Sequence, residues 1–151
     1  MKYTCEILVD VSRTVFIEKL NNPENMILWQ QGLLRYKVLS GTPGEEGAKM
    51  ELHYKMGKRE LVMIETILKQ DFPNEFHATY DAKGVHNIQR NYFEEVKAGQ
   101  TRWRAESEFQ FAGFFMKLMA FFMPGAFKKQ SMRYLRDFKA FAEKGITVNN
   151  P

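Results

Sequence analysis

The stretch that decides the fold is GFFMKLMAFFMPGAFKKQSMRYLRDFKAFAEKG, residues 113–145. Its second half, residues 126–144, is amphipathic, because side chains that suit a core recur at helical spacing and charged ones fall between them. The stripe that would face a core consists of Phe127, Ser131, Leu135, Phe138 and Ala142, with Tyr134 and Phe141 at its edge. Gly145 is a typical helix stop. A long helix with one apolar face must cover a sheet.

The first half of this stretch, residues 113–123, is apolar around nearly its whole circumference, with Lys117 as its polar residue. Pro124-Gly125 separates the two halves, because proline lacks an N–H group and breaks a helix. One sheet covers only one face of a helix, so part of Phe114–Met123 is predicted to be an exposed apolar patch. Such a patch could be a lid over a cavity, a dimer contact or a membrane-touching edge. The alternative is that the helices near Asn22 and the loops cover it.

The chain before this region reads mostly as strands joined by tight turns. Alternation of apolar and polar residues predicts strands at 3–9, 48–56 and 101–111, and the turns between them bound further strands at 33–40, 59–69, 75–82 and 85–96. Two short helices follow the first strand: Ser12 caps residues 13–20, and Asn22-Pro23 opens a second helix that ends near Trp29. Hairpin-length loops make the last six strands an antiparallel meander. We therefore expect a single α+β domain over residues 1–151, in which a curved antiparallel sheet of about seven strands wraps around the long C-terminal helix.

Composition excludes several classes of function. The net charge is only +4, and basic residues are interleaved with acidic ones, so no nucleic-acid partner is expected. The single cysteine, Cys5, cannot form an internal disulfide and suits a reducing compartment. The N-terminus lacks the apolar core of a signal peptide, and the apolar runs are too short to span a bilayer. We expect a soluble cytoplasmic protein, either a monomer or a homodimer.

Motifs for metal, cofactor or nucleophilic chemistry are missing from the sequence. The three histidines, His53, His77 and His86, do not stand at metal-ligand spacing with another His, Cys or carboxylate. No serine lies in a nucleophile-elbow context, and residues 41–47 have neither the spacing nor the following helix of a phosphate loop. The prediction is that no metal and no cofactor is bound.

Two charged residues are candidates for acid or base chemistry. Glu65 lies among Leu61, Met63 and Ile67 on one face of its strand, and burial there would raise its pKa. The opposite face is equally apolar, so the direction of Glu65 stays open. Arg90 lies in a strand with Asn87, Gln89 and Asn91, where neither face is clearly apolar; that strand could present polar groups to a ligand or be a solvated edge.

Aromatic and methionine side chains on the apolar parity of the strands indicate a cavity. A buried tyrosine hydroxyl needs a hydrogen-bond partner, and thioethers adapt to irregular guests. Several such rings with polar tips would orient an amphipathic ligand, whereas a solid core would use more Val, Ile and Leu. The predicted ligand-binding residues are Trp29, Tyr36, Met50, Leu52, Tyr54, Met63, Tyr80, Trp103, Ser107, Phe115, Leu118, Phe122 and Leu135.

The order of elements resembles the helix-grip fold of the START, polyketide-cyclase and birch-pollen-allergen (Bet v 1-like) families, collectively SRPBCC. The resemblance covers nearly the whole chain: the opening Tyr3-Thr-Cys-Glu-Ile-Leu-Val-Asp-Val-Ser12, the segment from Asn22-Pro23 to Trp29, the Glu65 strand followed by Asp71-Phe-Pro73 and Phe76, and the amphipathic C-terminal helix. It implies a large cavity between sheet and helix that holds an apolar or amphipathic small molecule. It implies no particular reaction, because this fold hosts carriers, cyclases, chaperone activators and sensors.

We therefore expect the chain to bind a hydrophobic or amphipathic small molecule, as a carrier or sensor, without covalent chemistry. One alternative is an enzyme of the polyketide cyclase, dehydratase or hydrolase type that uses Glu65, Arg90 or a tyrosine as acid or base. Another is a partner-binding or membrane-touching module that uses Phe114–Met123.

Overall fold

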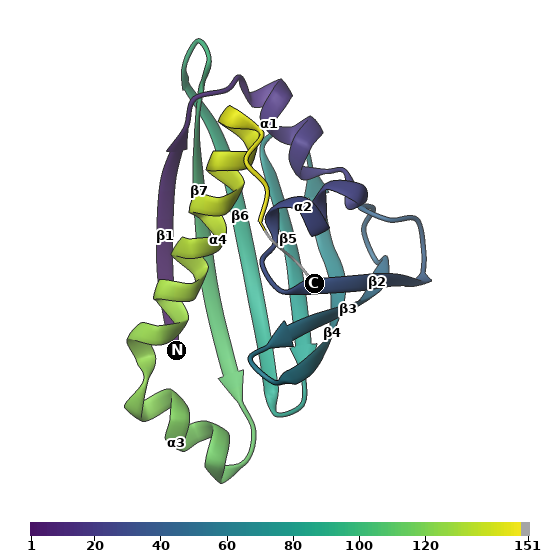
Figure 1. Ribbon diagram of the computed structural model, residues 1–151, viewed down its shortest axis with the longest axis vertical. Coiled ribbons are helices and arrows are strands. Elements are labelled where there is room, and N and C mark those ends of the chain that lie inside the picture. Colours follow the sequence, from purple (N-terminus) through teal and green to yellow (C-terminus); the bar gives the residue numbers. More distant parts are fainter. Residues whose placement is uncertain (149–151) are drawn as a thin grey trace.

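The structure, a computed structural model that describes residues 1–148, has the predicted order of elements (Figure 1). The elements are β1 (Lys2–Val9), α1 (Arg13–Leu20), the 3-10 turn η1 (Pro23–Asn25), α2 (Met26–Trp29), β2 (Leu33–Ser40), β3 (Lys49–Met56), β4 (Arg59–Asp71), β5 (Glu75–Ala82), β6 (Val85–Lys97), β7 (Gln100–Phe111), α3 (Phe114–Phe122) and α4 (Pro124–Lys144).

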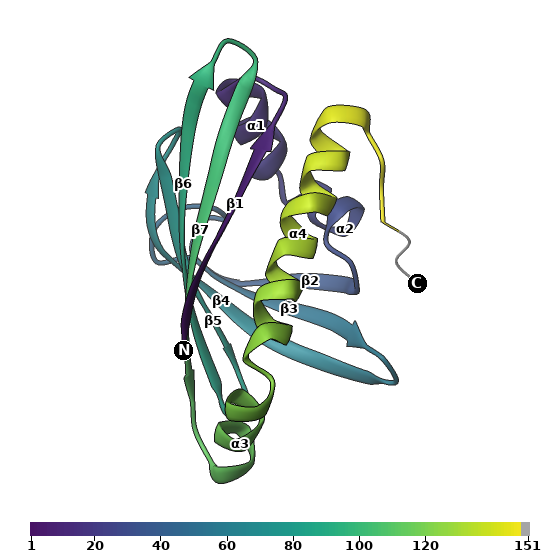
Figure 2. The ribbon, with the colours of Figure 1, turned by 90° about the vertical axis from the view of Figure 1, so that its left-hand side faces the viewer.

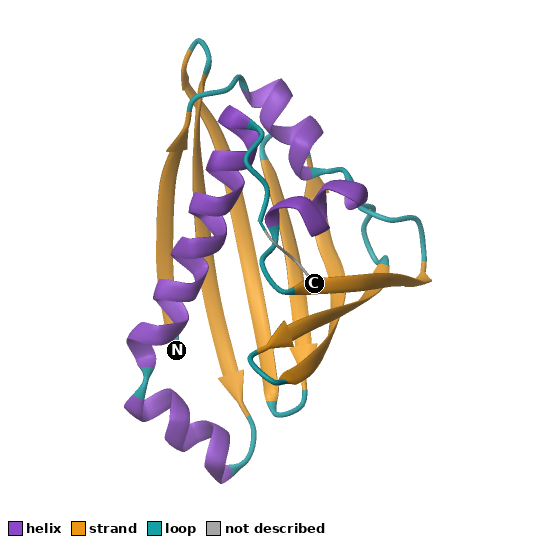
Figure 3. Ribbon diagram, in the orientation of Figure 1, coloured by secondary structure: helices purple, strands orange, loops and turns teal. Residues whose placement is uncertain are grey.

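The strands form one antiparallel sheet of seven strands in the order β1-β7-β6-β5-β4-β3-β2. The first strand closes against the last, from the pair Lys2–Glu108 to the pair Val9–Thr101. The sheet is curved, and α4 crosses its concave side with α1 and α2 beside it (Figures 2 and 3). The helix-grip arrangement that the sequence predicts is confirmed.

Local chemistry sets the ends of the helices. Ser12 Oγ accepts a hydrogen bond from Val15 N at 3.2 Å, and Asn22 Oδ1 accepts one from Glu24 N at 3.0 Å, so both predicted caps are present. Gly145 ends α4 in the left-handed conformation with φ of 66°.

Two helix boundaries differ from the prediction. The second helix is a 3-10 turn followed by a single α-helical turn, and its Asn25 Nδ2 donates to Lys19 O at 3.0 Å, which ties the segment to the end of α1. Helix α4 begins at Pro124 and not after it, because a proline in the first turn of a helix has no N–H to leave unpaired.

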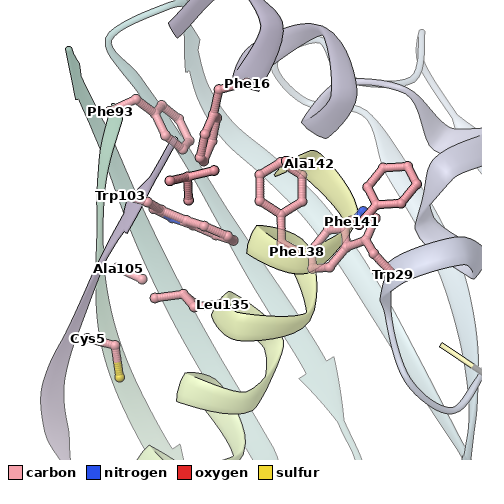
Figure 4. Close-up of a cluster of buried hydrophobic side chains, with 11 residues drawn as sticks. Cys5, Phe16, Trp29, Phe93, Trp103, Ala105, Leu135, Phe138, Phe141 and Ala142 are labelled. Atoms are coloured by element: carbon pink, nitrogen blue, oxygen red, sulfur yellow. The ribbon is translucent and has the colours of Figure 1, made fainter. Parts of the chain in front are cut away.

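An aromatic cluster joins the helices to the sheet at one end of the molecule. Phe138 of α4 is fully buried, and its ring lies 4.7 Å from Phe16, 5.1 Å from Trp29 and 5.4 Å from Trp103, each in an edge-to-face arrangement. Phe93 of β6 packs against Phe16 at 5.2 Å. Figure 4 shows these rings gathered between α4 and the sheet, so this part of the concave face is solid core.

Polar contacts hold α4 over the β1 edge. Tyr3 OH lies 2.7 Å from Ser131 Oγ, and Lys139 Nζ donates to Leu8 O at 2.7 Å. Further along, Asp10 N donates to Glu143 Oε2 at 2.7 Å. Helix α4 is fixed over β1 and the aromatic cluster. The concave face above β3, β4 and β5 is therefore covered by α2 and the loop before it.

Candidate ligand-binding site

A cavity of about 130 Å³ lies between the segment 20–30 and the concave face of the sheet. This volume is close to that of an engineered cavity of about 150 Å³ that holds benzene. It is below the roughly 300–1,000 Å³ of pockets for drug-sized ligands. Its apolar walls come from Leu20, Pro23, Met26, Trp29, Met50, Ile67, Phe76 and Trp103, and its polar lining from Asn21, Gln30, Glu65, Tyr80 and Asn91.

Two loops form the rim of this cavity. Asn21 follows α1 and is exposed, and Gly44 lies in the loop between β2 and β3. Gly44 has φ of +85°, and a Cβ added there would lie 3.0 Å from Asn21 Oδ1. Glycine is therefore required both by the backbone conformation and by the close approach of the two loops.

Strand pairing places Glu65 in the wall of the cavity. It stands opposite Met50 on β3 and Tyr80 on β5, and directly paired residues of antiparallel strands point to the same face. Both neighbours line the cavity, so the direction that the sequence left open is inward.

The environment of Glu65 favours its neutral form. Burial raises the pKa of its carboxyl, and a hydrogen bond with Tyr80 opposes this only in part. Burial also raises the pKa of Tyr80 well above its usual range, and the nearby Glu65 charge adds to the effect, so the phenol stays protonated and donates. No Lys, Arg or His is among the described residues that line the cavity. Glu65 is thus a carboxyl group in an apolar cavity whose lining supplies no cation.

Hydrogen bonds orient the other polar groups around the cavity. Tyr54 OH donates to Gln30 Oε1 at 2.6 Å, and Trp103 Nε1 donates to Asn91 Oδ1 at 2.9 Å. A second pair continues along β6 and β7, where Ser107 Oγ donates to Gln89 Oε1 at 2.9 Å. The inward face of β6 is therefore polar, and the solvated-edge alternative is wrong because β6 lies between β5 and β7.

The predicted ligand-binding residues fall into three groups. Trp29, Met50, Tyr80 and Trp103 line the cavity, together with Glu65. A packed cluster behind it, built around the buried Leu33, holds Tyr36, Leu52, Tyr54 and Met63. Away from the cavity lie Ser107, bonded to Gln89, Leu135 in the aromatic cluster, and Leu118 and Phe122 on the exposed side of α3. The side chain of Phe115 lies outside what the structure describes.

Arg90 is not part of this site. It pairs with His77 and Glu106 on the convex face, and its guanidinium lies 3.8 Å from the carboxylate of Glu108. This half-buried ion pair on the convex face explains Arg90 without a ligand.

Several lining residues were not found from the sequence. Ile67 and Phe76 share the strand faces of Glu65 and Tyr80, so the direction of Glu65 would have identified them. Met26 stands one helical turn before Trp29, so the predicted position of Trp29 would have identified it. Asn21 and Gly44 lie in loops, where no periodicity indicates a direction.

Two further features are missing from the described residues. None of their helices is long and apolar enough to cross a membrane. Within residues 1–148, no group of three or more His, Cys, Asp or Glu side chains is arranged to hold a metal ion.

Comparison with known proteins rests on structure, because no protein-family model and no curated protein matches the sequence. The ZhuI aromatase/cyclase from Streptomyces sp. R1128 superposes with a TM-score of 0.78 at 11% identity, over 94% of this chain and 93% of that one. Ara h 8.0201 gives 0.74 at 10%, and major latex-like protein 151 from Panax ginseng gives 0.73 at 12%; each covers 94% of this chain and 97% of the other. At these identities the likeness concerns the fold alone, and the chain has the helix-grip fold that these proteins share.

Proposed function

We propose that the chain binds a small hydrophobic or amphipathic molecule in the cavity between the sheet and the segment 20–30. The observation that supports this most strongly is the composition of the lining. Apolar walls surround a carboxyl group, Glu65, that has a tyrosine donor and no cation among the described lining residues. An apolar cavity with a few placed polar groups is the usual form of a small-molecule site.

The size of the cavity limits what binds without rearrangement. A one-ring ligand that buries roughly 120 Å² of apolar surface gains about 3 kcal/mol at 25 cal/mol per Å². Such a ligand binds weakly, because this gain is smaller than the roughly 4 kcal/mol of binding free energy that corresponds to a Kd of about 1 mM. Tighter binding of a larger molecule requires the rim at Asn21 and Gly44 to open.

The polar end of the ligand is expected to carry a hydrogen-bond donor. Glu65 offers carboxyl oxygens as acceptors, and Tyr80 already supplies one donor to it. An ammonium group would supply the cation that the lining lacks and would stabilise the ionised form of Glu65, whereas a carboxylate ligand would raise the pKa of Glu65 further.

The test is an NMR titration with three matched probes, namely benzylamine, benzyl alcohol and benzoate. Saturable shifts of the Trp29 and Trp103 indole N–H signals are expected, strongest for the amine and weakest for benzoate. Glu65→Gln should remove the preference for the amine while the alcohol still binds. Ile67→Phe, which fills the cavity, should abolish binding of all three, and Leu68→Ala on the exposed face of β4 is the matched control. The absence of saturable shifts for every probe would refute the proposal.

A second function is favoured by the same carboxyl group. Burial raises the pKa of Glu65, and a buried carboxyl of raised pKa beside an apolar cavity is a candidate general acid or base for an enzyme acting on an apolar substrate. Glu65→Gln is nearly isosteric and removes this ability. If a substrate is found and the variant turns it over at the wild-type kcat, the acid–base role is wrong.

A further inference from the structure

Helix α3 contacts the rest of the molecule through one side. Met116 lies against the turn between β5 and β6, where a Cβ added to Gly84 would be 3.1 Å from Met116 Cγ. Among the side chains of α3 that the structure describes, Met116 and Ala120 are the half-buried ones. Figures 1 and 2 show α3 beyond the lower end of α4, at the extremity of the sheet and away from the aromatic cluster.

The opposite side of α3 exposes three large aromatic side chains. Phe114 is 82% exposed, Phe121 77% and Phe122 70%. Phe114, Leu118 and Phe121 are spaced i, i+4 and i+7, so they form one stripe on the helix surface. At about 200 Å² for each ring, the three phenylalanines expose roughly 450 Å², which alone equals the largest apolar patch of a typical monomer. An outward apolar face of this size indicates a binding surface.

The charged residues of α3 and of the first half of α4 are all basic. Between Ala112 and Arg136 the sequence has five basic residues and no acidic one. All five are exposed: Lys117, Lys128, Lys129, Arg133 and Arg136. Lys117 lies on α3 itself, and Lys128 and Lys129 lie in the first two turns of α4, next to it. The apolar surface is therefore bordered by positive charge that no acidic residue within that stretch neutralises.

We propose that α3 and the start of α4 dock on the surface of an anionic lipid bilayer. Phe114, Phe121 and Phe122 would enter the boundary between headgroups and acyl chains. The lysines would lie against the phosphate groups. Aromatic side chains prefer this interface, and basic residues next to an apolar helix face are attracted by anionic lipid.

Charge distinguishes a bilayer from the other possible occupants. A second copy of the chain would bring two sets of these cations together across the contact, whereas anionic lipid supplies the opposite charge. A lid over the cavity described above is not supported, because none of the described residues lining that cavity comes from α3. The docking surface is thus separate from the proposed ligand site and does not depend on it.

The test is flotation of the full chain with vesicles of phosphatidylcholine alone or with 30% phosphatidylglycerol. Partition into the anionic vesicles is expected, with at least a tenfold lower partition coefficient for neutral vesicles. The double substitution Phe121→Ala/Phe122→Ala should lower partition into anionic vesicles at least tenfold, as should Lys128→Glu/Lys129→Glu. Leu68→Ala is the control, because Leu68 is an exposed apolar residue, 49% accessible, on a distant strand. Circular dichroism should show every variant folded, since the substituted side chains are exposed.

Three results would overturn the proposal. One is equal partition into neutral and anionic vesicles, and another is binding that survives the double phenylalanine substitution. The third combines two observations: the wild-type chain floats with neither kind of vesicle, and analytical ultracentrifugation shows a dimer that Phe121→Ala/Phe122→Ala dissociates. That result would assign the surface to a second copy of the chain.

Discussion

Replacing Phe138 by alanine should destabilise the domain more than the same change elsewhere in the C-terminal region. Phe138 is fully buried and contacts three rings edge to face, those of Phe16, Trp29 and Trp103. Truncating a buried phenylalanine costs about 3–5 kcal/mol. Each aromatic pair contributes about 0.5–1.5 kcal/mol beyond its buried area, so the loss should fall in the upper half of that range. With a total stability of about 5–15 kcal/mol for a domain, about 4 kcal/mol is a large fraction.

The assay is urea unfolding followed by circular dichroism, with Phe121→Ala as the matched control. The control deletes the same atoms from a ring that is 77% exposed, so its unfolding free energy should stay within about 0.5 kcal/mol of wild type. For Phe138→Ala the melting temperature should fall by about 10 °C or more, since 1 kcal/mol corresponds to roughly 2–4 °C at this size. Phe138→Leu, which removes less volume, should lie between the two. A loss below about 1.5 kcal/mol for Phe138→Ala, or equal losses for both alanine variants, would refute the reasoning.

Three further substitutions test the site and its supports. Burial raises the pKa of folded Glu65 above its unfolded value, so wild type loses stability as pH rises through the folded pKa, while Glu65→Gln does not. Urea unfolding from pH 4 to 8 should show the variant gaining on wild type by about 1.4 kcal/mol for each pKa unit of elevation, and a constant difference would contradict the burial of this group. Tyr54→Phe removes the hydroxyl that donates to Gln30 and should cost about 1 kcal/mol in the same assay; no loss would mean that this bond contributes nothing. Ser12→Ala removes the cap of α1 and should also cost about 1 kcal/mol, whereas Thr14→Ala on the exposed side of that helix should cost less than half as much.

Most of the fold could be predicted because its signals are local. Clean alternation in β3 and β7, the cap at Ser12 and the stop at Gly145 each act within a few residues of the chain. The exposed face of α3 was also predictable, since a helix that is apolar all round cannot be covered by one sheet. The cavity rim was not predictable, because it depends on how closely the loops at Asn21 and Gly44 approach each other.

The directions of Glu65 and Arg90 depend on strand register. The two-residue turn after Met56 pairs Met50 with Glu65 without interruption, so the clear alternation of β3 already implied that Glu65 points inward. The pairing of β4 with β5 gives the same direction only because of a bulge. If the register of the pair Asp71–Glu75 continued along the strands, Glu65 would stand opposite Asp81, which points to the convex face. The irregularity between Ile67 and Lys69 shifts the register by one residue and places Glu65 opposite Tyr80.

Arg90 shows the same effect between β6 and β7. The turn at 98–99 pairs Lys97 with Gln100. If this register continued along the two strands, Arg90 would stand opposite Ser107, which faces inward. A shift between Glu95 and Lys97 moves the pairing by one residue, so Arg90 faces Glu106 on the convex side and Asn91 turns toward the cavity. A one-residue slip exchanges the two faces of a strand, and β6 is polar on both faces, so its own pattern could not report the slip. The polar lining of the site is therefore set by bulges in the two long strands.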